Sequence, residues 1–152
     1  MKKLLEINLK TLHVGRARRT VTLKIGDDDE ITEGLDLLLE EKPKDFEKLR
    51  TAIRVISEVP HYSNDQKFKN LKKGLYEIKI SGFRVYAFLD DHPESTQQLV
   101  ICACHGGKAN KRSQNADIIK ARDIRKKYLK ERDKETTHVI LEKLETETSD
   151  ES

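Results

Sequence analysis

The stretch FKNLKKGLYEIKISGFRVYAFLDDHPESTQQLVICACHGGK, residues 68–108, carries the strongest structural signal in the chain. Residues 75–80 and 83–88 are two runs with period-two alternation, and only Ser-Gly separates them. Alternation with a period of two is typical of half-buried strands, and a two-residue link predicts a β-hairpin. The apolar run at 99–104 predicts a third strand. Together these patterns predict a small sheet with one apolar face and one charged face.

The same alternation predicts which charged residues meet. Side chains two apart on a strand point to the same face. Glu77 and Lys79 are therefore expected to share the charged face with Arg84 from the neighbouring strand, and His105 is expected at its rim. We expect any chemistry to take place on this face.

The segments before this stretch predict at least one strand and two helices. Residues 20–25 alternate cleanly, whereas residues 5–12 fit either the first strand of a hairpin or part of a loose basic arm. An acidic turn offers N-cap oxygens to a helix with an apolar stripe at 31–39. A second helix is predicted to begin at Pro43 and to end before Pro60. We expect the two helices to cover the sheet as an antiparallel pair and to carry no chemistry.

Charge is distributed unevenly along the 152 residues, whose net charge is +3. Residues 61–134 hold 17 basic and 9 acidic side chains, a balance of +8, and residues 135–152 hold 1 basic and 6 acidic, a balance of −5. A basic segment beside an acidic tail favours a polyanionic partner such as nucleic acid, but basic side chains on a helix face can also simply be solvated.

No signal peptide or membrane span is visible, which predicts a cytoplasmic protein with no membrane partner.

The C-terminal part predicts a long basic helix followed by a tail. Residues 114–132 carry a narrow apolar line among many basic side chains. Residues 139–144 fit one or two further amphipathic turns, and residues 146–152 have the polar, acidic composition of a disordered segment. The acidic tail is expected to fold back over the basic face and to mimic RNA. The chain is thus predicted to divide into an N-terminal extension, a central domain and an acidic tail, at residues 1–18, 19–134 and 135–152.

Two cysteines and a histidine stand together at the end of the third strand. Cys102 and Cys104 are predicted to share a face as buried, reduced thiols, because their sulfurs diverge too far for an easy disulfide. With His105 they also suggest a metal site, although no second pair of ligands with zinc-finger spacing follows. A metal-dependent enzyme is therefore the remotest hypothesis.

Four motifs in this order resemble the HigB branch of the RelE-like toxins, the phage-derived Gp49-like proteins. FKNLKKGLYEIKI at 68–80 is similar to that branch's K-x-L-x-x-G-L-Y-E-L-R segment, and RVY at 84–86 is similar to its R-(V/I)-(F/Y)-(Y/A)-F strand. HG at 105–106, with the lysines that follow, is similar to its H-G-F-x-K-K run, and KARDIR at 120–125 resembles its closing A-x-x-R helix. The resemblance covers about residues 19–130.

The resemblance implies an α+β fold of the RelE-like kind, in which two N-terminal helices pack on a small antiparallel sheet and a basic helix follows. It implies the toxin of a type II toxin–antitoxin system, silenced by a small antitoxin with a helix-turn-helix domain. Such a toxin is a messenger-RNA endonuclease that acts in the A site of the 70S ribosome without a metal or other cofactor.

Metal-free cleavage of RNA needs a base, positive charge on the phosphate and a proton for the leaving oxygen. Arg84 is expected to stabilise the transition state by a bidentate contact, with additional charge from Lys79. Glu77 or His105 is expected to transfer protons. RNA binding is assigned to five further basic residues, Lys72, Lys73, Lys108, Lys111 and Arg112.

The rival hypothesis is an inactive relative that uses the same sheet to bind RNA or a protein. Glu77 favours it, because the RelE branch proper carries a basic residue there. Tyr128 is the only late tyrosine, and its place on the apolar line of the helix indicates core packing rather than catalysis. Arg84 could also form an ion pair with Glu77 across the hairpin.

Overall fold

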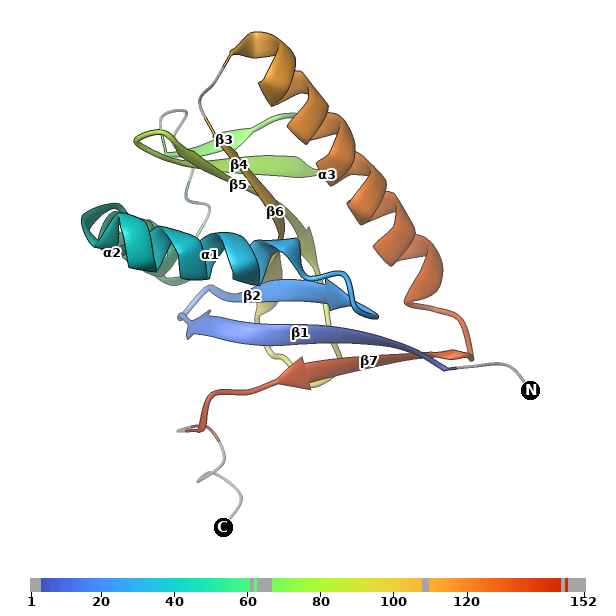
Figure 1. Cartoon of the computed structure of the whole chain (residues 1–152). Helices are drawn as coiled ribbons and strands as arrows, with labels where there is room; N and C mark the ends of the chain where they lie inside the picture. Colours follow the sequence, from blue (N-terminus) through green and yellow to red (C-terminus); the bar gives the residue numbers. More distant parts are fainter. Residues whose placement is uncertain (1–3, 61, 63–66, 108–109, 146, 148–152) are drawn as a thin grey trace.

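The computed structural model describes residues 4–60, 62, 67–107, 110–145 and 147. Figure 1 shows one strongly twisted sheet with the long helix α3 running across it. Along the chain the elements are β1 (Leu5–Val14), β2 (Arg18–Ile25), α1 (Glu30–Glu41), α2 (Pro43–Glu58), β3 (Phe68–Asn70), β4 (Leu75–Ile80), β5 (Phe83–Asp90), β6 (Gln98–Gly107), α3 (Lys111–Glu131) and β7 (Thr137–Glu142).

Within the described residues the sheet has seven strands, in the order β3-β4-β5-β6-β2-β1-β7. It is mixed, because β2 runs parallel to β6 and β7 runs parallel to β1. The expected small antiparallel sheet is therefore wrong. The difference arises from two parallel pairings of distant segments, β2 with β6 and β1 with β7. The second pairing covers six residues, over which the two strands satisfy each other's backbone groups. Residues 139–144, expected as helical turns, lie largely in β7, since a short apolar run fits a strand or a helix equally well.

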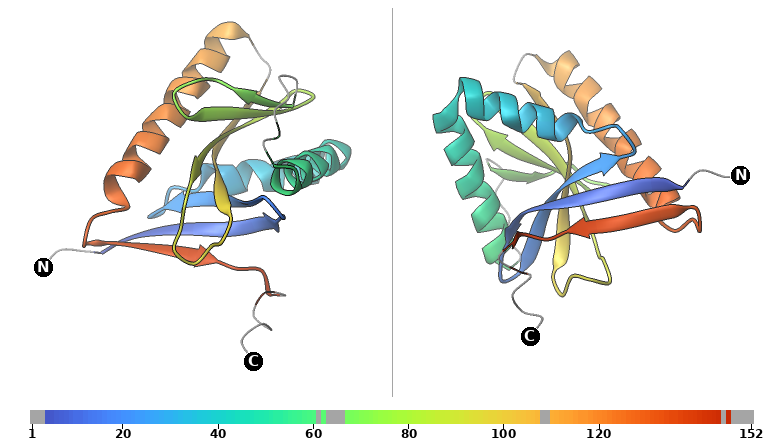
Figure 2. Two further views of the ribbon diagram at one scale, coloured as in Figure 1. Left: turned by 180° about the vertical axis from the view of Figure 1, so that it is seen from behind. Right: turned by 60° about the horizontal axis from the view of Figure 1, so that its bottom comes forward.

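Helices cover both faces of the sheet, α1 and α2 on one and α3 on the other (Figure 2). Alternate residues of each inner strand enter the two cores. On β6, for example, Cys102 packs with α1 and α2, whereas Ile101 packs against Tyr128 of α3. The run at 99–104 is continuously apolar because both of its faces are buried.

Local predictions made from short-range patterns are confirmed. The hairpin of β4 and β5 turns at Ser81, whose φ is +48°, and α2 begins at Pro43. Asp29 caps α1 by accepting a hydrogen bond from the Thr32 N–H at 3.2 Å. Of the two alternatives for residues 5–12, the structure has the hairpin, with β1 antiparallel to β2.

The end of the described chain returns to the sheet. Arg19 of β2 is 5% exposed and donates to the carboxylate of Glu147 through both terminal nitrogens, with Nη1 3.1 Å from Oε2. Arg19 also donates to Thr11 Oγ1 at 2.9 Å. These hydrogen bonds from Arg19 lower the pKa of Glu147. The carboxylate of Glu147 therefore stabilises an arginine of an inner strand. No helix in the described part of the chain is long and apolar enough to cross a membrane.

Candidate functional site

The hairpin of β4 and β5 brings three of the predicted site residues together. Lys79 is paired directly with Arg84, and Glu77 is paired with Tyr86. The Nζ of Lys79 lies 3.8 Å from Oε1 of Glu77. A glutamate, a lysine and an arginine thus share one face of the hairpin, as the alternation predicts.

Two of these three side chains are mostly buried. Arg84 is 8% exposed, and its Nη1 donates to the carbonyl oxygens of Ser81 at 2.8 Å and Phe83 at 3.2 Å. One guanidinium nitrogen is therefore used to close the turn. Glu77 is 4% exposed. Beside it, the Tyr86 hydroxyl makes no hydrogen bond of good geometry within the described chain, and burial followed by the Glu77 charge raises the pKa of Tyr86.

His105 lies on the opposite face of the sheet, so its predicted place beside Arg84 is wrong. The cause is a β-bulge in β6: Tyr86 pairs with Cys104 and Ala87 with Cys102, which leaves Ala103 without a partner on β5. One extra residue reverses the alternation beyond it. The His105 ring consequently stacks on Phe83, with centroids 5.5 Å apart, and packs against α1.

The same bulge separates the two cysteines. Cys102 belongs to the core under α1 and α2, and Cys104 to the core under α3, so the prediction that they share a face is wrong. Both thiols are free and buried, and burial raises the pKa of each to about 12. Among the described residues no three His, Cys, Asp or Glu side chains are placed to hold a metal ion. The metal hypothesis therefore has no site in the described chain.

The four predicted RNA-binding residues that the structure describes lie away from the face of Arg84. Lys72 and Lys73 form the turn before β4, at the end of the strand opposite to Lys79, with φ of +73° and +52°. Arg122 of α3 donates to the Lys72 carbonyl oxygen at 3.2 Å and holds this turn. The remaining residues belong to the start of α3 or precede it. Lys111 and Arg112 are exposed in its first turn, and Lys108 lies outside the described residues.

A basic pocket lies at the turn end of the hairpin. It has a volume of about 380 Å³, and all of its charged lining residues are cations. Lys79 and Arg84 come from the hairpin, Lys48 from α2, and Lys67 from the segment just before β3. The Lys67 carbonyl oxygen accepts a hydrogen bond from the Lys79 N–H at 3.0 Å, which fixes the two lysines side by side.

A second pocket of about 380 Å³ adjoins the first, and the two share Lys48 and Lys67. It adds Lys44 and Tyr62 to the lining. The Tyr62 ring is partly exposed and stacks on Phe68, with centroids 6.4 Å apart and planes at 19°. We call the two pockets together the basic groove.

The α2 side of this groove is not among the site residues predicted from the sequence. Lys44, Lys48, Thr51 and Val55 repeat at spacings of four, three and four, which places them on one stripe of the helix. The expectation that the two helices carry no chemistry leaves this stripe out. The signal that could have identified it is a pair of lysines at positions i and i+4 beside small and apolar residues.

Comparisons of the chain with protein-family models, with curated proteins and with solved structures find no match. The resemblance of residues 68–125 to the HigB branch therefore rests on the motifs alone.

Proposed function

We propose that the protein binds single-stranded RNA in the basic groove. The observation that carries this proposal is the meeting of five cations with a partly exposed, stacked tyrosine. Lysine and arginine attract the phosphates of the backbone, and an aromatic ring offers a base a stacking surface. A groove with both features suits a strand whose bases are unpaired.

The groove carries more positive than negative side chains, which favours a polyanion as its ligand. The one carboxylate in its lining is that of Glu47, which already accepts from Arg50 Nη1 at 3.1 Å. Asp45 lies 3.9 Å from Lys48 Nζ and Glu77 lies 3.8 Å from Lys79 Nζ, and each carboxylate offsets part of one lysine. The cations of the groove therefore keep an excess over their acidic neighbours, as phosphate binding requires.

Fluorescence anisotropy with a labelled single-stranded RNA tests the proposal. The double variant Lys48→Gln/Lys67→Gln should weaken binding and reduce the slope of log K against log salt by about 0.7 for each lost phosphate contact. A matched control, Lys126→Gln/Lys127→Gln, removes the same charge from exposed positions on α3. Equal losses in the two variants would mean that net charge, not the groove, binds the RNA.

Tyr62 provides a second readout. Removal of a base-stacking side chain costs about 1–3 kcal/mol of binding free energy. Tyr62→Ala should therefore weaken RNA binding at least about fivefold, which corresponds to the lower end of this range. Tyr62→Phe should bind RNA like the unmodified protein, because it keeps the ring. A Tyr62→Phe variant as weak as Tyr62→Ala would contradict stacking.

The second candidate function is cleavage of the bound RNA, favoured by the direct pairing of Lys79 with Arg84 beside Glu77. On this proposal the protein is a ribosome-dependent messenger-RNA endonuclease, with an antitoxin as partner, and Lys79 stabilises negative charge on the phosphate. His105 takes no part, since it lies on the other face. The ends of messenger RNAs should be mapped in one culture that expresses the protein and in another that expresses Lys79→Gln. This variant is chosen because a change at the buried Arg84 would disturb the fold more. Intact messages in both cultures would remove this candidate.

A further inference from the structure

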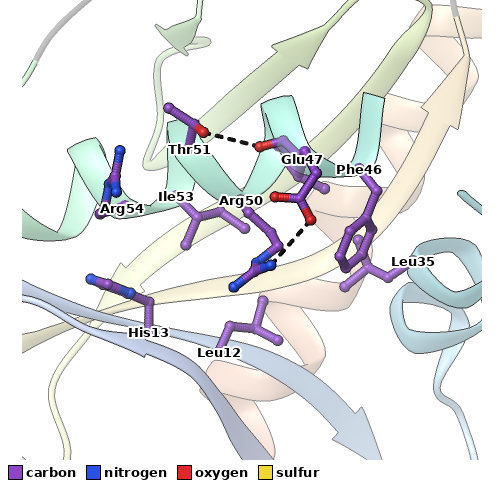
Figure 3. Close-up of a pocket in the computed structure, with 10 residues that line it drawn as sticks. Leu12, His13, Leu35, Phe46, Glu47, Arg50, Thr51, Ile53 and Arg54 are labelled. Carbon is purple, nitrogen blue, oxygen red and sulfur yellow. Dashed lines mark hydrogen bonds and ion pairs between the residues drawn. The ribbon is translucent and has the colours of Figure 1, made fainter. Parts of the chain in front are cut away.

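Another groove lies between the end of β1 and α2 (Figure 3), and it shares the lining residues Glu47 and Thr51 with the basic groove. It has a volume of about 310 Å³, at the small end of the range usual for small-molecule sites, about 300–1,000 Å³. Its lining divides into an apolar floor and a polar rim. The floor consists of Leu12, Leu35, Phe46, Leu49 and Ile53, and the rim of His13, Glu47, Arg50, Thr51 and Arg54.

The groove depends on a bulge in β1. Thr11 pairs with Val21 and His13 with Thr20, which leaves Leu12 without a partner on β2. Two successive side chains, those of Leu12 and His13, therefore both point toward α2, as Figure 3 shows. The pairing of β1 with β7 ends at Lys10, so this end of β1 is open along its edge within the described chain.

The rim carries more positive charge than its own contacts neutralise. Arg50 pairs with Glu47 at 3.1 Å. Arg54 is exposed and makes no hydrogen bond or ion pair with any described residue. His13 lies 3.6 Å from the Glu58 carboxylate through Nε2 but makes no hydrogen bond of good geometry with that nitrogen. Figure 3 shows the side chains of Arg50 and His13 directed into the space between α2 and the end of β1, with Arg54 farther along α2.

We propose that this groove binds a small amphipathic anion, with an aryl or alkyl body on the apolar floor and a carboxylate or sulfonate head at Arg54 and Arg50. The apolar side chains supply the affinity by removing the body of the ligand from water. The guanidinium groups favour a carboxylate or sulfonate head because each can donate two parallel hydrogen bonds to a pair of its oxygens. RNA does not suit this site, since the floor is apolar and too small for a strand. The proposal is independent of the basic groove.

The test uses the full chain with labelled methyl groups, observed by NMR. 4-Phenylbutyrate is the probe, and 4-phenylbutanol, which keeps the body and lacks the charge, is its matched control. We expect 4-phenylbutyrate to shift the methyl signals of Leu12, Leu35 and Ile53 in a saturable manner, and 4-phenylbutanol to bind about fivefold more weakly at low salt.

Variants distinguish the floor from the rim. Arg54→Gln should weaken 4-phenylbutyrate about fivefold and leave 4-phenylbutanol unchanged, whereas Lys126→Gln on α3 should change neither. Arg54→Lys should retain part of the preference for the anion. Absence of saturable shifts at the floor methyl groups, or equal binding of the two probes, would overturn the proposal. Arg54 is exposed, so its replacement does not threaten the fold.

Discussion

Replacement of Gly34 by alanine tests where His105 lies, which decides whether a histidine is available to the predicted nuclease site. A Cβ at Gly34 would stand 2.2 Å from His105 Cδ2 and 2.4 Å from Nε2. Over-packing of this kind lowers the free energy of unfolding by about 1–3 kcal/mol. Replacement of glycine by alanine inside a helix raises it by about 1 kcal/mol. The ring is held on its other side by Phe83 and cannot simply swing away. We expect Gly34→Ala to lower the free energy of unfolding by as much as about 2 kcal/mol.

The sign of the effect should reverse when the ring is absent. In a His105→Ala background the new methyl group meets no imidazole, and only the gain in helix propensity remains. Gly34→Ala should then stabilise the protein by about 1 kcal/mol. The double-mutant cycle therefore predicts a coupling energy of about 1–3 kcal/mol between the two positions.

Equilibrium unfolding in urea, followed by circular dichroism, measures all four proteins of the cycle. The m-value should remain the same, so that shifts in the midpoint report stability. If Gly34→Ala has the same effect with and without the ring, His105 does not pack on α1, and the bulge in β6 is placed wrongly. In that case the histidine returns as a candidate proton donor on the face of Arg84.

Three further predictions concern other contacts of the fold. Gly15→Ala should destabilise by about 3 kcal/mol or more, because the added Cβ would lie 2.2 Å from a backbone carbonyl oxygen of α2; a neutral result in urea would show that the β1–β2 turn packs less closely. Tyr128→Phe should cost about 1 kcal/mol, since its buried hydroxyl donates to Asp90 at 2.7 Å, and an unchanged midpoint would contradict that hydrogen bond. Cys102 and Cys104 have pKa values raised from 9.0 to about 12, so the folded state retains protons that the unfolded state loses. The contribution of the two thiols to the free energy of unfolding should therefore be fully present below pH 9 and be lost as the pH rises above it. Rapid labelling of both thiols by Ellman's reagent in the native protein would contradict their burial.

The sequence predicted what short-range patterns determine. The turn at Ser81, the cap at Asp29 and the start of α2 at Pro43 depend on residues within a few positions of one another. The pairing of Lys79 with Arg84 follows in the same way, because a two-residue turn sets the register of a hairpin. For this reason, three of the four predicted catalytic residues, Glu77, Lys79 and Arg84, lie on the face where the alternation places them.

Pairing between distant segments could not be predicted in this way. Nothing local to Thr137–Glu142 indicates that it pairs in parallel with β1. The apolar run that this segment contains is too short to distinguish a strand from a helix. The segment is a strand because it forms a ladder of backbone hydrogen bonds with β1. The basic groove is non-local for the same reason, since Lys48 and Lys79 meet only once α2 has packed against the sheet.

Two bulges, each of one residue, set the chemistry available on this sheet. Without the bulge at Ala103, alternation along β6 would place His105 on the same face as Arg84, and the predicted nuclease set would be complete. Without the bulge at Leu12, only one of the two side chains Leu12 and His13 would point toward α2, and the groove between β1 and α2 would lose part of its lining. The few residues on either side of a bulge show the same alternation as in a regular strand. Periodicity therefore predicts the strand, but not the face of the sheet to which the side chains beyond the bulge point. On the proposed function, cations and the Tyr62 ring of the basic groove contact the RNA, while the histidine that the nuclease hypothesis uses as an acid is packed into the opposite core.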